Sequence, residues 1–206
     1  MVTDPPYGVD YDPAWRANVL GDVGAGAVAT GRVENDHRCD WGDAWRWFGG
    51  DVAYVWHGAL HGDVVRRSLE AERFDIRSQI IWDKGQFVIS RGHYHWRHEA
   101  CWYAVRRGAT AHWSGSRTQS TVWMIPHRKS DTGHGTQKPV RLMQVPIENN
   151  SAPGDVVFDP FLGAGATLLA AEQTGRICIG FEIKPVYVDI AVSRWERLTG
   201  KCALRS

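Results

Sequence analysis

The stretch Asp4-Pro5-Pro6-Tyr7 combines residue types that together can hold and activate an amine. Two prolines prevent a helix or a strand ladder from continuing, so a stiff loop is expected directly after Met1-Val2-Thr3. A carboxylate and a proline carbonyl can accept both protons of an exocyclic amine, while the tyrosine ring stacks on the attached base. An amine held in this way can offer its lone pair to an electrophilic methyl group. A proline-rich turn that only closes a strand is the alternative for this stretch alone.

A second motif that could bind a reactant begins at Asp159, which is followed by the glycine turn Pro160-Phe161-Leu162-Gly163-Ala164-Gly165. Its glycines let the backbone approach a ligand, and the following helix offers its N-terminal dipole. The spacing from Gly163 to Glu182 is near that expected for an acid on ribose hydroxyls. A dinucleotide site would need a third glycine. The acid before the turn instead suits a ligand with a charged amino group, such as the methionine end of S-adenosylmethionine. A βαβ turn that binds nothing is the alternative.

The elements around these motifs predict an α/β fold with a doubly wound, mostly parallel sheet. Open sheets of this kind bind ligands at the carboxyl ends of their strands, where both motifs are expected. Strands are expected at residues 1–3, 51–56, 75–82, 99–105, 155–159 and 176–181, and helices at 63–73, 140–147, 167–173 and 185–198. The last helix would bury Val186, Ile190, Ala191, Trp195 and Leu198 on one face. A short helix near residues 43–48 and loops over most of 9–50, 84–98 and 108–137 complete the pattern.

The composition is that of one ordinary globular domain spanning residues 1–206, with 43% hydrophobic and 23% charged residues. No apolar run approaches the roughly 20 residues of a membrane span. The acid and prolines from Asp4 onwards do not fit a signal peptide. The four cysteines are scattered without zinc-site spacing, which predicts reduced thiols in a cytoplasmic protein.

Positive charge is concentrated in the middle of the chain. Residues 84–141 contain ten of the 24 Lys and Arg residues but only two of the 23 acidic residues, Glu99 and Asp131. Aromatic residues are interleaved with these charges, as in surfaces that bind a polyanion with stackable bases. A solvated basic face is the alternative. Nucleic acid is therefore the expected partner, with five arginines as candidate contacts: Arg91, Arg97, Arg106, Arg107 and Arg117.

Several motifs, in their order along the chain, resemble the amino-methylating N4/N6 DNA methyltransferases. Asp4-Pro5-Pro6-Tyr7 precedes the Asp159–Gly165 motif, which is the order of the permuted β group. The chain as a whole is similar to phage and prophage DNA modification methylases of this type, enzymes known from restriction-modification. The matching stretches include Ile81-Trp82-Asp83-Lys84, Tyr94-His95-Trp96-Arg97-His98-Glu99, Thr136-Gln137-Lys138-Pro139 and Gly180-Phe181-Glu182-Ile183.

This resemblance implies S-adenosylmethionine-dependent methylation of adenine N6 in DNA by direct transfer. Asp4 and the carbonyl of Pro5, within the loop completed by Pro6, would hold the amine, and Tyr7 would stack on a base swung out of the duplex. The implied cofactor site contains Asp159, Phe161, Gly163, Gly165, Thr167 and Glu182, with Lys138 closing its methionine end. An Asp in the first motif favours adenine, because cytosine-N4 relatives more often have Ser there. Cytosine N4 is the nearest alternative substrate.

The sequence differs from the family pattern in two respects, and each difference leads to further predictions. The family has a Gly-Asp segment and an edge strand upstream of the amine motif, whereas the given chain begins at Met1. An incomplete sheet edge, weak cofactor binding and association into a homodimer through that edge are therefore expected. The basic region at about 84–137 would recognise the target, but its part at 108–137 is small, which predicts a short or relaxed recognition sequence.

The sequence is open to three other interpretations. A DNA-binding remnant without turnover would follow from the missing upstream segment, and a nicotinamide-dependent oxidoreductase would follow from the glycine turn alone. A metal could be held by His93, His95 and His98, but imidazoles on a turn-rich stretch more often contact solvent or phosphate, and no metal is expected.

Overall fold

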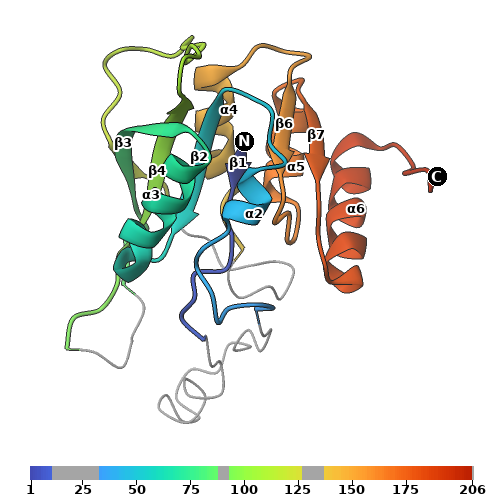
Figure 1. Ribbon diagram of the computed structural model, residues 1–206. Helices are drawn as coiled ribbons and strands as arrows, with labels where there is room; N and C mark the ends of the chain where they lie inside the picture. Colours follow the sequence, from blue (N-terminus) through green and yellow to red (C-terminus); the bar gives the residue numbers. More distant parts are fainter. Residues whose placement is uncertain (11–32, 88–92, 127–136, 206) are drawn as a thin grey trace.

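The computed structural model describes residues 1–10, 33–87, 93–126 and 137–205. Their strands form a five-stranded sheet, in the order β1-β2-β4-β3-β5, and a two-stranded sheet of β6 and β7 that lies beside β1 (Figure 1). The strands are β1 (Val2–Thr3), β2 (Val52–His57), β3 (Phe74–Asp83), β4 (His98–Arg106), β5 (Val122–Met124), β6 (Val156–Asp159) and β7 (Ile177–Gly180).

Strand direction determines which loops can meet. The pairs β1–β2, β3–β5 and β6–β7 are parallel, whereas β4 runs antiparallel to both of its neighbours. Its register places Ala100 opposite His57 and His98 opposite Asp83. The amino end of β4 therefore lies at the same edge of the sheet as the carboxyl ends of the parallel strands. This mixed, mostly parallel sheet confirms the predicted fold class.

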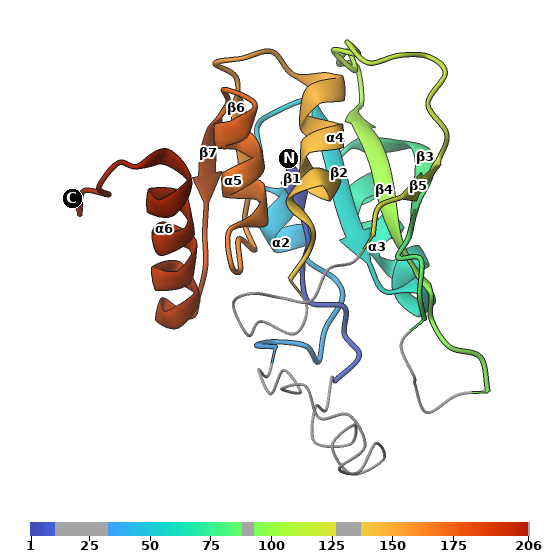
Figure 2. The ribbon, with the colours of Figure 1, turned by 180° about the vertical axis from the view of Figure 1, so that it is seen from behind.

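Helices cover both faces of the strands. On one face lie α2 (Gly42–Trp45) and α3 (Gly62–Ala71), with the short 3-10 turn Ala59–His61 before α3 (Figure 1). On the other face lie α4 (Val140–Asn150) and α5 (Ala166–Gln173), while α6 (Pro185–Thr199) stands beyond β7 (Figure 2). Among the described helices, none is both long and apolar enough to cross a membrane.

Alternation along β2 explains why both faces need a cover. Tyr54 and Trp56 belong to one buried cluster, with Leu142 of α4. Val55 belongs to the other, with Leu69 of α3. Successive strand residues point to opposite faces, so a strand that is apolar at every position is stable only between two layers. This sandwich holds the carboxyl ends of the strands rigidly in place.

Two expectations about the elements were wrong. β5 was expected to be loop, because residues 108–137 show no clear period and are rich in Ser, Thr, Gly and His. It is a strand because it pairs with β3. The apolar face of α6 was expected to be buried, but Ala191 is its one buried residue. Val186 and Leu198 remain 57% and 41% exposed.

Candidate active site

The two motifs meet through one buried hydrogen bond. Thr3, the last residue of β1, donates from its hydroxyl to the Asp159 carboxylate at the end of β6, over 2.6 Å. Both side chains are buried. Asp4 follows Thr3, and the glycine turn follows Asp159, so this bond places the two loops side by side at the lower edge of the sheets in Figure 1.

The glycine turn has the backbone shape that its sequence predicts. Gly163 and Gly165 have φ angles of +52° and +82°, in the left-handed region that favours glycine. A side chain at Gly165 would lie 2.9 Å from the Cβ atom of Ala191, so the turn passes close to α6. Glu182, just after β7, accepts the Gly163 amide at 2.8 Å and the Lys184 amide at 2.8 Å. The predicted ribose acid therefore lies directly on the glycine turn.

Asp159 is a buried acid with few compensating charges. Burial raises the pKa of its carboxyl to about 6, although hydrogen bonds from Thr3 and the Phe161 amide favour the ionised form. Thr167, in the first turn of α5, is also buried. A protein tolerates such an acid at a cost in stability, which is typical of functional sites.

The amine motif lies in a cluster of charged side chains. The Tyr7 hydroxyl oxygen lies 2.8 Å from Asp4 Oδ1, and the Lys138 ammonium donates to Asp4 Oδ2 at 2.6 Å. The Lys138 Nζ atom also lies 5.1 Å from the centre of the Tyr7 ring. Lys138 comes from the segment just before α4, so the tertiary fold brings it to Asp4 across 134 residues. The structure shows this contact with the amine motif, and the place of Lys138 at the methionine end of a cofactor stays a prediction.

Glu99, at the amino end of β4, completes the cluster. Its Oε2 atom accepts the Tyr7 hydroxyl at 2.9 Å and lies 3.0 Å from the Lys138 Nζ atom. Its Oε1 atom lies 3.3 Å from the Nζ atom of Lys84. Neither Glu99 nor Lys84 was predicted as a site residue. The one available signal was their position in stretches that resemble the family.

The two carboxyls of the cluster differ in their pKa values. Burial and the negative charge of Glu99 raise the pKa of Asp4, although Lys138 opposes the shift. Burial would also raise the pKa of Glu99, but the ammonium groups of Lys138 and Lys84 outweigh it and lower the value to about 2. Glu99 is therefore the permanently ionised member, and Asp4 is the one that takes up a proton more readily.

Trp41 joins the two loops from the face of α2. Its indole N–H donates to the Pro6 carbonyl at 3.0 Å, and its ring packs edge-on against Phe161 with 4.7 Å between the ring centres. Pro5, in the same loop, is buried. The sequence showed a tryptophan here without indicating its role, because no periodicity marks residues 33–41. It braces the amine loop against the glycine turn.

Four of the five arginines predicted to contact DNA are described, and these four do not form one surface. The prediction that Arg106 contacts DNA is corrected. Its guanidinium donates to the carbonyls of Gly50, Glu72 and Phe48 and therefore stabilises the fold. Arg107 follows Arg106 at the carboxyl end of β4, away from the candidate site, and pairs with Asp75. Arg97 pairs with Asp83 near the amino end of β4, on the side of the site. Arg117 is exposed, and Arg91 lies outside the described residues.

The segment that carries Arg117 is anchored far from Lys138. Gln119 exchanges two hydrogen bonds with Asn149, and Ser114 donates to carbonyls of the same turn of α4. Lys138 precedes the first turn of α4, whereas Asn149 lies near its carboxyl end, about 14 Å along the helix from Val140 at 1.5 Å per residue. Arg97 is therefore the one described arginine of the five that is placed beside the site.

Two of the three histidines considered for a metal lie against aromatic rings. His95 stacks on Phe87 with 5.3 Å between ring centres, and His98 packs edge-on against Trp96 at 5.7 Å. In the described part of the chain, no group of three or more His, Cys, Asp or Glu residues is arranged to hold a metal ion.

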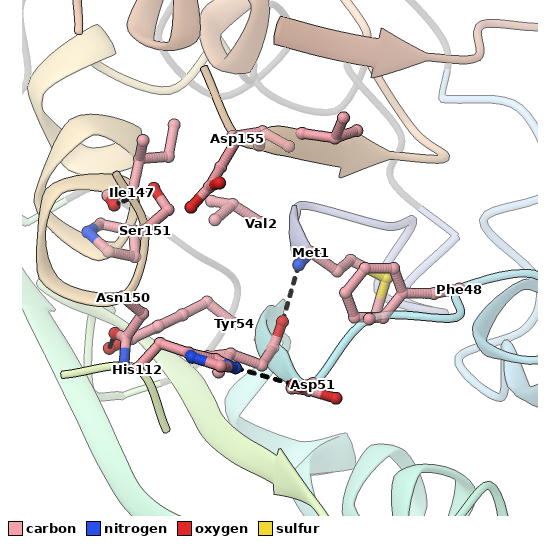
Figure 3. A pocket seen from close by; sticks show the side chains of 15 residues that line it. Met1, Val2, Phe48, Asp51, Tyr54, His112, Ile147, Asn150, Ser151 and Asp155 are labelled. Atoms are coloured by element: carbon pink, nitrogen blue, oxygen red, sulfur yellow. Dashed lines mark hydrogen bonds and ion pairs between the residues drawn. The ribbon is translucent and has the colours of Figure 1, made fainter. Parts of the chain in front are cut away.

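A cavity of about 220 Å³ opens at the other end of the strands. Figure 3 shows Met1, Asp51, Tyr54, His112, Asn150 and Asp155 around it, with His112 bonded to Asp51 at 2.7 Å. These residues lie near the amino ends of β1, β2 and β6, whereas both motifs lie at the carboxyl ends. The cavity is therefore separate from the candidate site.

Comparison with known proteins agrees with this geometry. The model of the N6/N4 methyltransferase family, described as DNA methylase, matches residues 1–193. The chain belongs to this family of DNA methylases. Among curated relatives, the type II methyltransferase M.Cfr9I of Citrobacter freundii is 28% identical over 144 residues. That match covers 62% of this methylase and 46% of the relative, so the chain spans about half the length of this relative.

Solved structures share the fold of the methylase at low sequence identity. The complex of M1.HpyAVI with SAM superimposes with a TM-score of 0.65 and 22% identity, covering 94% of this chain and 86% of that one. The cytosine-N4-specific PvuII DNA methyltransferase gives a TM-score of 0.62 and 17% identity, covering 97% and 82%. These neighbours confirm that the methylase has the methyltransferase type of α/β fold.

Proposed function

We propose that this methylase transfers a methyl group from S-adenosylmethionine to the N6 amine of adenine in DNA. The observation that carries the proposal is the bond between Thr3 and Asp159, because it places the amine loop beside the glycine turn. A methyl donor at the turn and an amine at Asp4 would then lie next to each other. Holding two reactants in line is the main requirement of a direct transfer.

The residues around the glycine turn fit the cofactor. Asp159 offers a buried carboxyl for an amino group, and Gly163 and Gly165 allow close approach of the backbone. Glu182, bonded to the Gly163 amide, would accept from the ribose hydroxyls. Phe161 and Thr167 flank the turn on either side. Bound there, S-adenosylmethionine would supply an electrophilic methyl group. The similarity to M1.HpyAVI, solved as a complex with SAM, supports this assignment.

Asp4 retains the capacity to hold an amine even though both of its oxygens already have partners. A carboxylate oxygen can accept a second hydrogen bond, so an amine N–H can be added without displacing Lys138. The Pro5 carbonyl would take the other N–H, and Tyr7 would stack on a base swung out of the duplex. The amine nitrogen would then form its bond to the methyl carbon as the carbon–sulfur bond breaks and leaves its electron pair on sulfur.

DNA is the proposed macromolecular substrate, in the cytoplasm, which is the compartment that the reduced cysteines indicate. The described cysteines are all free. Around the site, Tyr94 is 92% exposed and Trp96 is 42% exposed, close in sequence to Arg97. Exposed aromatic rings beside a cation suit unstacked bases and phosphates.

A homodimer is proposed through β7, the outer strand of its two-stranded sheet. Ile177 and Ile179 are 56% and 47% exposed, and Ile183 after the strand is 71% exposed. An apolar strand with one described neighbour favours pairing with another chain. Sedimentation velocity should show a mass that rises with concentration. A single-chain mass at the highest concentrations would contradict the proposal.

The function is tested by methyl transfer from labelled S-adenosylmethionine to mixed-sequence DNA, followed by digestion to nucleosides. Label is expected in N6-methyladenine, with loss of activity in Asp4→Asn. Asp43→Asn is the control, since Asp43 is an exposed acid paired with Arg38 on the surface. Label in N4-methylcytosine would favour the cytosine alternative, which the similarity to PvuII supports. DNA binding without transfer would favour a remnant and contradict the proposal.

A further inference from the structure

The Glu99 carboxylate holds the donor groups of three side chains in the cluster at once. The Tyr7 hydroxyl and the Lys138 ammonium approach its Oε2 atom, and the Lys84 ammonium approaches its Oε1 atom. Its side chain is 22% exposed and comes from β4, a rigid central strand. The carboxylate therefore has a fixed position relative to Tyr7.

The Tyr7 hydroxyl has one proton but lies within hydrogen-bond distance of two carboxyl groups. Its oxygen is 2.8 Å from Asp4 Oδ1 and 2.9 Å from Glu99 Oε2. One O–H group can satisfy only one of these contacts. The second contact is favourable when a carboxyl group carries a proton of its own and donates it to the tyrosine oxygen. Two ammonium groups keep Glu99 ionised, so a proton released to this pair of carboxyl groups during turnover binds to Asp4.

We infer that Glu99 is a positioning residue for the transfer, because it turns the Tyr7 hydroxyl proton away from Asp4. The Tyr7 oxygen then faces Asp4 as an acceptor. When the methylated amine releases its proton, the N–H bond breaks and an O–H bond forms on Asp4 Oδ1. The new O–H group donates to Tyr7, and Tyr7 donates to Glu99, so every contact in the chain is satisfied. This inference rests on the proposed function of Asp4 as the amine-binding acid.

The charges around Asp4 determine how this coupling responds to pH. Glu99 raises the pKa of Asp4 as a like charge, and Lys138 lowers it. Six titratable groups surround Asp4. They are Tyr7 of its own loop, Glu99 and Cys101 of β4, Asp159 of β6, Lys138 before α4, and Lys84 just after β3, which acts on Asp4 through Glu99. Removal of the charge of Glu99 should therefore make Asp4 a weaker proton acceptor and lower its pKa.

The test is Glu99→Gln, which keeps the size of the side chain but removes its charge. A fall in kcat on the order of 100-fold is expected, the loss typical of a misplaced reacting group, with little change in KM for DNA. The acid limb of the rate profile should move to lower pH. Glu148→Gln is the matched control, because Glu148 is an exposed acid paired with Arg141 on α4, and its profile should stay that of the wild type.

Two further variants separate positioning from folding. Glu99→Asp keeps the charge and should keep the acid limb near its wild-type position even if kcat falls. Tyr7→Phe removes the relayed hydroxyl, so combining it with Glu99→Gln should cost less than the sum of the two single losses. Additive losses in a folded double variant would overturn the inference.

A readout independent of activity distinguishes failure of this inference from failure of the proposed function. The Asp4 carboxyl carbon can be followed by NMR in protein labelled with ¹³C-aspartate and assigned by Asp4→Asn. Its titration should move to lower pH in Glu99→Gln and stay unchanged in Glu148→Gln. If the wild type transfers no methyl group but the Asp4 titration still moves in Glu99→Gln, the function is refuted and the coupling is supported. An active wild type without the movement would refute the coupling.

Discussion

At the scale of single residues, Asp159 combines a structural cost with a proposed role. Its carboxyl is buried at the end of β6, and its pKa is raised from 3.8 to about 6. The folded state therefore binds the proton more tightly than the unfolded state. Stability from this group is fully present below pH 3.8 and is lost as the pH rises to about 6.

Asp159→Asn should consequently stabilise the protein at neutral pH while weakening cofactor binding. The neutral amide avoids the cost of a buried charge, about 3 kcal/mol for a pKa shift of this size, and its oxygen still accepts from Thr3. Urea unfolding at pH 7 should show a higher midpoint than the wild type, and the difference should disappear near pH 3.5. Calorimetry should show weaker binding of S-adenosylmethionine. A lower midpoint at pH 7 would contradict the prediction.

Lys138 is the residue whose loss should destabilise the cluster most. Asp4 and Glu99 both lie within 3.0 Å of its ammonium group, and the lysine side chain is 7% exposed. In Lys138→Met, two largely buried carboxylates lose their shared cation, at a cost of about 3 kcal/mol. Thermal or urea unfolding at pH 7 should measure this loss, and adding Asp4→Asn should recover part of it.

Lys201→Met is the control for this loss. Lys201 is 67% exposed and lies 3.8 Å from Glu172, so its removal should change stability by less than about 0.5 kcal/mol. Equal losses in the Lys138 and Lys201 variants would show that the cluster does not stabilise the fold.

At the scale of elements, the glycine turn depends on close packing between α5 and α6. Gly165 and Gly154 both have left-handed backbone, with φ angles of +82° and +90°. A Cβ atom at Gly165 would lie 2.9 Å from that of Ala191, whereas at Gly154 it would meet nothing within 4 Å. The two positions separate backbone strain from crowding.

Gly154→Ala should cost about 1 kcal/mol of stability, because alanine disfavours this backbone conformation. Gly165→Ala should cost about 1–3 kcal/mol more, because the added methyl group pushes against Ala191. Chemical denaturation of the two variants measures the difference. The Gly165 variant should also bind cofactor less well, since its turn must shift. Equal losses of stability in the two variants would show that α6 shifts to accommodate the added methyl group without a cost in free energy.

At the scale of the whole molecule, the opposite ends of the strands have different roles. Arg97 and Arg107 are alike as side chains, both about half exposed and both paired with one aspartate. They lie at opposite ends of β4, and Arg97 is at the end that carries Glu99 and the site. The antiparallel direction of β4 places Arg97, rather than Arg107, at the end of the sheet that carries the site.

Arg97→Gln should therefore weaken DNA binding at low salt and reduce the salt dependence of the binding constant by about 0.9 in log–log slope, the value for one phosphate contact. Arg107→Gln should leave the slope unchanged. Fluorescence anisotropy with a labelled duplex over a range of salt concentrations measures both. Equal effects of the two substitutions would show that DNA contacts both ends of the molecule.

Local sequence patterns predicted the elements that carry the two motifs. Asp4-Pro5-Pro6-Tyr7 and Asp159–Gly165 were recognisable because proline, glycine and a terminal acid act within a few residues of each other. Strands and helices followed from apolar periodicity, which is also local. Arg97 and Arg106 were indistinguishable at this level, since both are cations beside predicted strand ends.

The tertiary structure alone decided what surrounds the amine motif. Lys138 reaches Asp4 across 134 residues, and Glu99 reaches Tyr7 across 92. These contacts depend on the order of the strands and on the reversed direction of β4, neither of which leaves a periodic trace in the sequence. The same reversed direction places Arg106 at the end of the strands opposite to the candidate site. The sequence by itself determined which groups could do the chemistry; the packing of the sheets determined which charges control them.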